Sequence, residues 1–529
     1  MAKIVKSKSY LIVSSAHLGL SEDILQIYSQ VQKEYGAEVI HLGPTVTDQE
    51  YNKYMKIKDK IKDAELQSTL VDLTDRQAET LDEKMHSLEF QMDVIEDEES
   101  DRISKLRAYF GKDMKFITTN KLSLPARNKD KCFVFGGVEI SKYLYLSPIP
   151  PTGMKATRNP INSVAMSYLK DKGRSWIVSH PVPAVVPFAK PGLNKAWNCF
   201  AVGSLMHQQE PHRTNEQYQT AHMPCAIMVT LDQRTGEFHA KQMHIDYLTH
   251  KFEENSNPVV IDDGQVFFPK KVIDVKSKDK AVYSTDDHAP WTHPGCIAAV
   301  RTLNELHENE TFINGGDAAD FASVSRHSEN IPGEREGLRL RADLENLRLL
   351  LDAQVNTKRI KNKVLIDSNH HEWVSQFVER NPNMKGWCDW KTLAVERFSD
   401  WDLKIRKPGE TEIYYFGDLP IRHGDEDGNA KKAEGIYNGG KYLGGHWHSR
   451  MSYRRSNQVG CGTQLGPKYV GGRNTPWQNM ATSITKYRGV TGSSPKMIFH
   501  DKKKNVSRFE YRGKIYEANH YVVDWTGKG

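Results

Sequence analysis

Five short polar segments in the second half of the chain combine residue types that bind metal ions. The segments are Asp286-Asp287-His288, Gly316-Asp317, Asn369-His370, His423 and Gly445-His446-Trp447-His448. Carboxylates, imidazoles and amide oxygens are ligands of divalent transition metals. Two such ions about 3.5–4 Å apart repel each other, so a bridging carboxylate is usually needed between them. We therefore predict that these segments converge on a site for two metal ions.

Each of these side chains has a place in such a site. Asp286 and His288 stand two residues apart just past an apolar run, so they can bind one ion together. Asp317 can supply the bridging carboxylate. One amide oxygen and three imidazoles come from Asn369, His423, His446 and His448. This mixed set suits manganese, iron or zinc better than calcium or magnesium alone. We expect two divalent cations, with Mn²⁺ as the first choice and Mg²⁺, Fe and Zn as alternatives.

Apolar runs and amphipathic stretches alternate around these segments. Strands are predicted at 281–284, 311–314 and 363–366, with helices at 296–306 and 335–355. This alternation indicates an α/β fold with a mainly parallel sheet covered by helices, in which ligands collect at the carboxyl ends of the strands. Because all five polar segments follow strand-like runs, we expect them to meet at one edge of the fold.

The composition limits the class of protein. A chain of 529 residues is too long for one ordinary core, so two domains are expected. The formal charge of +6 permits a nucleic-acid partner without arguing for one. The six cysteines are scattered, which fits reduced thiols. The sequence shows no signal segment and no long apolar run. We therefore expect a cytoplasmic protein, in the host cytoplasm if phage-encoded, with no membrane partner.

The order Asp-x-His, Gly-Asp, Asn-His, His and Gly-His-x-His resembles the calcineurin-like metallophosphoesterase family, over roughly residues 280 to 470. That family includes phosphatases, cyclic-nucleotide phosphodiesterases and nucleases. The run Gly-Asp-x-x-Asp followed by an arginine, a long helix and Asn-His also resembles metallophosphatases encoded by bacteriophages, including DNases that degrade host DNA. Two departures are Ser368, where the family usually has glycine, and His371, where an acidic residue usually follows.

The resemblance implies a role for each ligand. It assigns the first metal to Asp286, His288, Asp317 and His448, and the second to Asp317, Asn369, His423 and His446. It makes Asp317 and His370 the catalytic residues, with His370 off the metals and acting on the leaving oxygen or the transition-state charge. The implied mechanism is in-line attack on phosphorus by a hydroxide that bridges the two metals.

The first half of the chain repeats the layout of the second. We therefore predict an α/β protein (an α+β sandwich) of two tandem metallophosphoesterase-like β-sandwich domains with flanking helices. The bounds are a degenerate domain at 1–255 with a helical insertion at about 48–112, a linker at 256–280, and a catalytic domain at 281–529. The insertion is highly charged with helix-spaced apolar residues, which favours a helical hairpin. A dimerising coiled coil is the alternative, although its heptads are not sustained.

The expected counterparts of the metal ligands in the first half lack most metal-binding groups. They are Ser15-Ala16-His17 for Asp286-Asp287-His288, Gly43-Pro44 for Gly316-Asp317, Asn120-Lys121 for Asn369-His370, His180 for His423, and Gly203-Ser204-Leu205-Met206 for Gly445-His446-Trp447-His448. We infer a tandem duplication whose first copy holds no metal pair and serves assembly or substrate positioning. The alternative is that any α/β domain places polar residues at strand ends with such gaps.

The ligand set alone does not choose among phosphoesters. A DNA nuclease with little sequence specificity is favoured, because arginines stand near the active-site segments and no DNA-reading module is recognisable. The candidate substrate-binding residues are Arg326, Arg422, Arg450, Arg454 and Arg455. DNA is the expected partner, and association with copies of the same chain is compatible with the sequence. The alternatives are a phosphatase or small phosphodiesterase acting on nucleotides or phosphoproteins, and a non-catalytic assembly protein.

Overall fold

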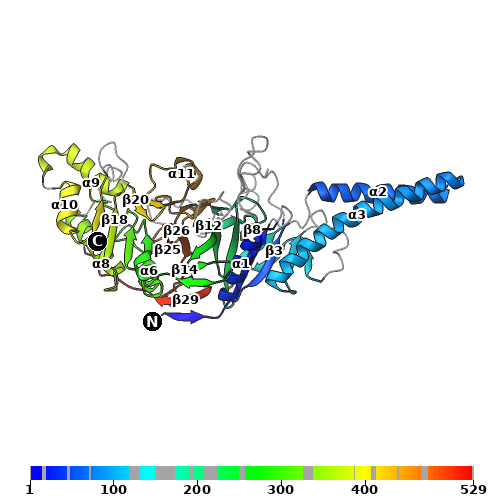
Figure 1. Cartoon of the computed structure of the whole chain (residues 1–529). Helices are drawn as coiled ribbons and strands as arrows, with labels where there is room; N and C mark the ends of the chain where they lie inside the picture. Colours follow the sequence, from blue (N-terminus) through cyan, green and yellow to red (C-terminus); the bar gives the residue numbers. More distant parts are fainter. Residues whose placement is uncertain are drawn as a thin grey trace.

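The computed structural model shows a mixed α/β protein built from several sheets with helices outside them (Figure 1). The described residues are 2–14, 20–43, 48–70, 73–118, 131–148, 173–189, 196–205, 223–248, 257–325, 338–386, 388–406, 413–437, 440–465 and 475–526. No helix within these ranges is both long and apolar enough to span a lipid bilayer.

A nine-stranded sheet is formed by the first half of the chain, in the order β15-β14-β13-β12-β11-β2-β3-β4-β5. Strands β2 to β5 run parallel to one another, and β11 and β12 are antiparallel neighbours on the other side of β2. The strands are β2 (Ser7–Ser14), β3 (Glu38–Leu42), β4 (Lys115–Thr118), β5 (Phe133–Phe135), β11 (Cys225–Asp232), β12 (Phe238–Tyr247), β13 (Pro258–Asp262), β14 (Gln265–Phe267) and β15 (Val272–Asp274).

A six-stranded sheet in the second half repeats the central part of this order. It runs β26-β25-β16-β17-β18-β19, which corresponds strand for strand to β12-β11-β2-β3-β4-β5 with the same directions. The strands are β16 (Lys280–Ser284), β17 (Thr311–Asn314), β18 (Asn362–Ile366), β19 (Asp402–Lys404), β25 (Met480–Tyr487) and β26 (Val490–Met497). The two halves therefore share a sheet topology.

A ten-stranded sheet is shared by both halves. Its order is β20-β21-β22-β24-β23-β9-β10-β8-β7-β6, so each half contributes five strands in mirrored order. The halves join where β23 pairs antiparallel with β9, with Ser452 opposite Val185. The strands are β6 (Val138–Ser141), β7 (Leu144–Ser147), β8 (Ser175–Val178), β9 (Ala184–Ala189), β10 (Ala196–Ala201), β20 (Tyr414–Phe416), β21 (Leu419–Ile421), β22 (Tyr442–Gly444), β23 (Met451–Tyr453) and β24 (Ser456–Gln458).

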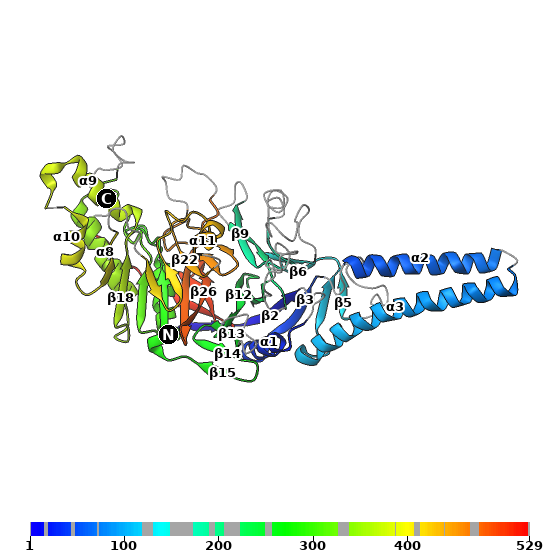
Figure 2. The same cartoon turned by 45° about the horizontal axis from the view of Figure 1, so that its top comes forward.

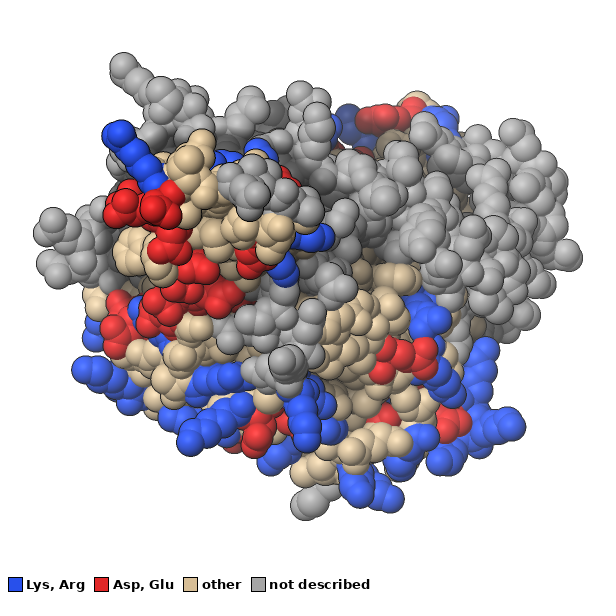
Figure 3. Space-filling model, turned by 90° about the vertical axis from the view of Figure 1, so that its right-hand side faces the viewer, with Lys and Arg blue, Asp and Glu red and all other residues tan. Residues whose placement is uncertain are grey.

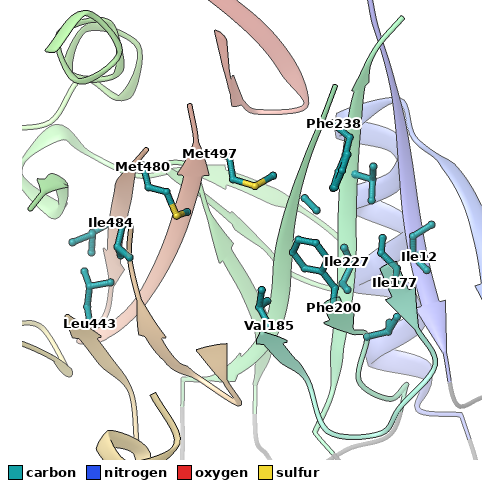
Figure 4. Packing of buried hydrophobic residues seen from close by; sticks show 14 of the residues in the cluster. Ile12, Ile177, Val185, Phe200, Ile227, Phe238, Leu443, Met480, Ile484 and Met497 are labelled. Atoms are coloured by element: carbon teal, nitrogen blue, oxygen red, sulfur yellow. The ribbon is translucent and has the colours of Figure 1, made fainter. Parts of the chain in front are cut away.

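The main apolar core fills the space between these sheets and is continuous across both halves. Figure 4 shows Ile12, Phe200 and Ile227 of the first half in the same cluster as Leu443 and Ile484 of the second. Burial of such side chains contributes roughly 1.5–3 kcal/mol each. The core therefore stabilises the two halves together.

Helices cover the outer faces of the two flanking sheets. Helix α1 (Glu22–Tyr35) packs on the nine-stranded sheet, because Ile24, Ile27 and Val31 lie on one face of the helix and are fully buried. Against the six-stranded sheet lie α6 (Pro294–His307), α8 (Leu340–Gln354), α9 (Asn369–Arg380) and α10 (Trp390–Arg397). A short helix, α11 (Ala430–Ile436), packs beside β23 and β24.

Two long helices, α2 (Asp48–Leu70) and α3 (Asp75–Phe110), occupy the stretch for which a helical hairpin was expected. Figure 2 shows the pair projecting from the body of the protein. Near the base of the hairpin, Arg102 of α3 donates to the carboxylate of Glu50 of α2 at 3.1 Å and so joins the two helices. A small apolar cluster around Tyr54, Ile57 and Ile95 holds the two helices together.

The stretch expected to be a linker, 256–280, instead contains β13, β14 and β15. Val259, Val260 and Val266 are buried there. Gly264 adopts a positive φ of 81° in the turn between β13 and β14. Gly264 therefore marks a hairpin turn and not a flexible linker.

The chain termini meet in a fourth sheet, ordered β1-β29-β28-β27. Strand β1 (Lys3–Val5) pairs antiparallel with β29 (Lys514–Asn519), and β28 (Val506–Tyr511) and β27 (Phe499–Asp501) follow. The first strand of the chain thus adds to a sheet made by the last.

A buried charge cluster lies where the two halves meet. It consists of Lys241, Asp262 and Asp263 from the first half with Lys496 and Glu510 from the second. One oxygen of Asp263 lies 2.6 Å from both lysine ammonium groups. Because all these side chains are nearly inaccessible to solvent, each charge depends on its partners.

Candidate metal centre

The predicted ligands lie at the ends of strands from two facing sheets. In the six-stranded sheet, Asp286 and His288 follow β16, Asp317 follows β17, and Asn369 begins α9 after β18. In the ten-stranded sheet, His423 follows β21, and His446 and His448 follow β22. Strands β16, β17 and β18 are parallel, as are β21 and β22, so their carboxyl ends face the same region.

Five of these ligands have a left-handed backbone. Positive φ values occur at Asp286 (52°), His288 (50°), Asp317 (47°), His446 (69°) and His448 (54°). Residues other than glycine adopt this conformation at a cost of order 1–3 kcal/mol each, and such residues cluster at functional sites. The concentration of strain at these positions supports a functional role for them.

The first ligand group is formed by Asp286, His288 and His448. The Nε2 atoms of the two histidines lie 3.2 Å apart. The Nε2 atom of His448 also lies 3.2 Å from Oδ1 of Asp286. The three side chains are buried and their ligand atoms fall within 4.8 Å of one another. Two imidazole nitrogens and a carboxylate oxygen at this spacing can share one cation.

The second ligand group is formed by Asp317, Asn369, His423 and His446. Nε2 of His423 lies 3.1 Å from Oδ2 of Asp317 and 2.9 Å from Oδ1 of Asn369. His446 brings a third ligand atom within 4.8 Å of those of Asp317 and His423. Nδ1 of His446 is buried and has no hydrogen-bond partner among the residues that the structure describes. Such an orphaned nitrogen fits a metal ligand.

Asp317 stands between the two groups. Its Oδ2 atom, 3.1 Å from His423 Nε2, lies 3.9 Å from His288 Nε2 on the other side. The donor set and its burial therefore fit two divalent cations that share one carboxylate.

Neighbouring groups orient the ligand side chains. Nδ1 of His288 lies 3.1 Å from Oδ1 of Asp320, and Nδ1 of His423 lies 3.0 Å from the carbonyl oxygen of Gly315. These contacts turn the two Nε2 atoms into the site. The backbone N–H of His446 donates to the carboxylate of Asp286 at 2.9 Å, which holds that carboxylate against the other sheet.

His370 lies beside the two ligand groups and forms a further group with His288 and Asp317, in which the candidate ligand atoms lie within 4.8 Å of one another. Its Nδ1 is 2.8 Å from the carbonyl oxygen of Asp320, so that nitrogen carries a proton and donates it. Its Nε2 points toward Asp317 and lies 3.7 Å from Oδ2. The ring of Trp373 lies against the imidazole, with centroids 3.8 Å apart. Burial lowers the pKa of His370 to about 4.

Charge within the site is strongly coupled. Burial alone would raise the pKa of Asp317, but His370 and His423 hold it well below its ordinary value. Burial alone would lower the pKa of His423, but Asp317 raises it to about 9. The extra proton on His423 occupies a position that a cation would take, since metal binding requires neutral histidine.

Three of the five predicted substrate arginines make hydrogen bonds within the protein. Arg422 contacts Asp427 and Glu426, each at 2.6 Å. Arg450 is buried and donates to the carbonyl oxygen of Ala240 at 2.7 Å. Arg455 donates to the carbonyl oxygen of Ile245 and Arg454 lies over the ring of Tyr453, whereas Arg326 lies outside the described residues. The prediction that Arg422, Arg450 and Arg455 contact substrate is therefore not supported.

Residue type and spacing did not identify several supporting residues. Asp320 is one of them, and its carboxylate supports His288. Ser368, a departure from the family pattern, accepts a hydrogen bond from the backbone N–H of Asp317 at 2.9 Å. Its position next to Asn369 was the only signal for this role. His371 is buried near Asp367 and stacks on Trp390, so it does not reach the ligands.

The counterparts in the first half differ from those expected. The N–H of Gly445 bonds to the carbonyl oxygen of His423, and the N–H of Ser179 bonds in the same way to Ser147. Ser147 therefore corresponds to His423, and His180, which follows Ser179, corresponds to His446. The N–H of Gln478 donates to the carbonyl oxygen of His448, and the N–H of Met223 donates in the same way to the carbonyl oxygen of Pro181. Pro181 therefore corresponds to His448.

The pairing of His180 with His423 was wrong. Both residues follow a strand and both precede a glycine by a similar number of residues, so the spacing cannot distinguish them. The order of the strands in the sheet does. Gly203 corresponds to Gly460 rather than Gly445. Gly203 follows β10, the neighbour of β8, and Gly460 follows β24, the neighbour of β22. Residues 15–17, Pro44, 120–121 and Met206, which were also assigned as counterparts, lie outside the described residues.

Comparisons with known proteins add little. No protein-family model and no curated protein matches the chain. One solved structure to which it is similar is Vacuolar Protein Sorting 29 from Cryptosporidium parvum, at 9% identity over 46% of this chain and 97% of that one, with a TM-score of 0.21. A likeness at this score carries no argument about fold or function.

Proposed function

We propose that the chain is a two-metal phosphoesterase that hydrolyses phosphodiesters, with DNA as its substrate. One observation carries the proposal: the seven residues expected as ligands come together in two groups that share Oδ2 of Asp317. Sites of this composition catalyse phosphoryl transfer to water, because the bound cations neutralise phosphoryl oxygens and lower the pKa of water.

The chain's own residues would position the reaction. Asp286, Asp317 and the histidine ligands fix where the phosphate sits between the two sheets. Nδ1 of His370 donates its proton in a hydrogen bond to the carbonyl oxygen of Asp320. Proton exchange therefore takes place at Nε2, the nitrogen that faces the site. A phosphate beside His370 would raise this low pKa, and the imidazolium that then forms can donate its Nε2 proton to a leaving oxygen.

Most contacts with DNA would fall on the phosphate backbone. The helical hairpin is not suited to this role, because α3 carries eleven acidic and five basic residues. Figure 3 views the molecule from the hairpin's side and shows acidic side chains gathered in its upper left among scattered Lys and Arg. We therefore assign DNA to the face that carries the metal ligands and not to the hairpin.

A nucleotide phosphodiesterase or phosphatase is the second candidate. The observation that favours it is the internal pairing of Arg422, Arg450 and Arg455, which removes three cations from those expected to hold a polymer backbone. A small substrate needs fewer such contacts than DNA does.

One set of assays separates these functions. Plasmid DNA, linear DNA, para-nitrophenyl phosphate and its bis ester are each incubated with Mn²⁺, Mg²⁺ or EDTA. Metal-dependent DNA cleavage that disappears in Asp317→Ala supports the nuclease. Asp352→Ala, on the exposed face of α8, is the control and should keep full activity. Turnover of the small esters without DNA cleavage would favour the second candidate, and no turnover with any substrate would refute both.

We also infer that the two halves are tandem metallophosphoesterase-like domains and that only the second binds metals. The shared strand order of the flanking sheets and the mirrored order of the ten-stranded sheet support the duplication. Ser147 and Pro181 at the positions of His423 and His448 support the loss of the first site. Metal analysis should find two ions per chain and no change in His180→Ala. Four ions per chain would contradict this inference.

A further inference from the structure

A cavity of about 700 Å³ lies where the two halves meet. The first half contributes residues of β10 and β12, and the second contributes β26, β27 and the segment before β25. This volume lies within the range of sites for small organic ligands. None of the predicted metal ligands lines it.

Aromatic rings form much of its wall. Trp197 and Phe238 come from the first half, and Trp477 and Phe499 from the second. The ring of Tyr143 lies against that of Trp197, with centroids 5.9 Å apart. Such flat apolar faces stack well on a planar ligand.

Polar atoms in the wall lack partners. Nε1 of Trp197, Oδ1 of Asn198, Oε1 of Gln478 and Nε2 of His520 are buried and have no hydrogen-bond partner among the described residues. Buried polar groups are normally paired. These atoms lie just behind the cavity surface, so a ligand can pair them once their side chains turn toward the cavity. An indole N–H only donates, while an amide both donates and accepts, so the ligand must offer both kinds of group.

The wall carries little net charge. His293 and His500 stack with centroids 3.7 Å apart. Burial lowers the pKa of His293 to about 4 and that of His500 further, so both are neutral near pH 7. Glu237 is paired with Arg508 at 2.6 Å. Lys502 adds one ammonium group to the wall, and the rest of the wall suits a neutral planar group.

A metal ion held by His293, Cys296 and His500 is disfavoured, although the three groups are close. The amide nitrogen of Asn479 donates to the carbonyl oxygens of Cys461 and Thr463. Its Oδ1 must therefore accept the proton of His500 Nε2, 3.0 Å away. That nitrogen has no free lone pair for a metal.

The cavity adjoins the candidate metal centre. The ring of Trp477 lies against that of His448, with centroids 4.2 Å apart. The backbone N–H of Gln478 donates to the carbonyl oxygen of His448 at 2.9 Å. One ligand residue of the metal centre thus packs directly on the cavity wall.

We propose that this cavity binds the nucleobase of the nucleotide whose phosphate is held at the metal centre. A nucleobase is planar, neutral and carries both donors and acceptors on its edge, which matches the aromatic wall and its unpaired polar atoms. The assignment rests on the proposed phosphoesterase function, and it makes the nucleotide next to the scissile bond a recognised part of the substrate.

Binding of the four deoxynucleosides and of their 5′-monophosphates is measured by calorimetry on the full chain in EDTA. We expect at least one nucleoside to bind, and Asn198→Leu to weaken it about tenfold through loss of the amide. His520→Ala, at the half-buried edge of the cavity, is a second variant. It replaces Asn198→Leu if that variant has a lower melting temperature than the unchanged protein. Asn52→Leu, exposed on α2, is the control.

The outcomes separate this inference from the function on which it rests. Absence of nucleoside binding, or equal binding by the Asn198→Leu and His520→Ala variants and the control, would overturn the cavity assignment even if bis-para-nitrophenyl phosphate is hydrolysed. Binding that survives in Asp317→Ala and is lost in the cavity variants supports it. Nucleoside binding without metal-dependent hydrolysis of any ester would instead refute the phosphoesterase and leave the base site in place.

Discussion

The Nε2 atoms of His288 and His448 face each other at 3.2 Å although the residues come from different sheets. Two neutral imidazoles can face each other in this way only if one donates a proton to the other or both bind a cation. We expect Mn²⁺ to raise the melting temperature, because a ligand at 100 times its dissociation constant stabilises the folded state by about 2.7 kcal/mol. Scanning calorimetry with and without EDTA measures the shift, and His448→Ala should reduce it whereas Asp352→Ala should not.

Asp317→Asn tests the shared carboxylate. The substitution keeps the shape of the side chain but removes the charge that lies between His288 and His423. We expect a loss of about 10³-fold in kcat, at the upper end of what single electrostatic groups contribute, together with fewer than two bound ions per chain. Activity within tenfold of the unchanged protein would show that Asp317 does not bridge metals.

Asp320→Asn tests the support of His288. Its carboxylate holds Nδ1 of that histidine at 3.1 Å without belonging to either ligand group. Loss of such a contact typically weakens metal affinity by about 10–100-fold. Metal titration should show this weakening while activity recovers at saturating Mn²⁺. An unchanged affinity would assign Asp320 a purely structural role.

Gly316→Ala tests the close approach at the second ligand group. A Cβ atom there would lie 2.8 Å from Cβ of Ser368 and 2.9 Å from Nδ1 of His423. Gly111 is a matched control, since its φ is also 99° but nothing lies within 4 Å of a Cβ atom. We expect Gly316→Ala to lose metal binding and activity, and Gly111→Ala to lose only some stability. Equal activity in both variants would contradict the geometry.

Asp263→Asn tests the buried charge cluster. Burial opposes ionisation of Asp263, but Lys241 and Lys496 hold its pKa below the ordinary value of 3.8. A lowered folded-state pKa stabilises the protein above pH 3.8, and that stabilisation is lost as the pH falls below this value. At pH 7 the variant should lose about 3–5 kcal/mol, because two buried lysines lose a partner. Urea unfolding should show the deficit shrinking below about pH 4, and a constant deficit would refute the assignment.

The convergence of the residues expected as metal ligands could be predicted from the sequence because its rule is local. Each follows an apolar run, and the carboxyl ends of parallel strands converge whatever their order. The alternation of strands and helices was also predictable, as was the charged helical hairpin. These features depend on neighbours within a few residues.

The remaining features depend on partners far along the chain. Arg450 has the charge of a phosphate-binding residue, but its acceptor is the carbonyl oxygen of Ala240, 210 residues away. His180 corresponds to His446 rather than His423 because of strand order, which spacing does not reveal. Strands β13 to β15 extend a sheet whose other strands lie far earlier in the chain, so from the sequence alone their turns resembled a linker.

The pairing of β9 with β23 has a consequence for any shortened form of the protein. A fragment beginning at residue 281 would keep every expected metal ligand but would expose the free edge of β23, and it would also lose β1 from the edge of β29. Unpaired strand edges invite association with other chains. The first half thus covers strand edges of the half that carries the candidate metal centre, and removing it should yield aggregates rather than a smaller folded protein.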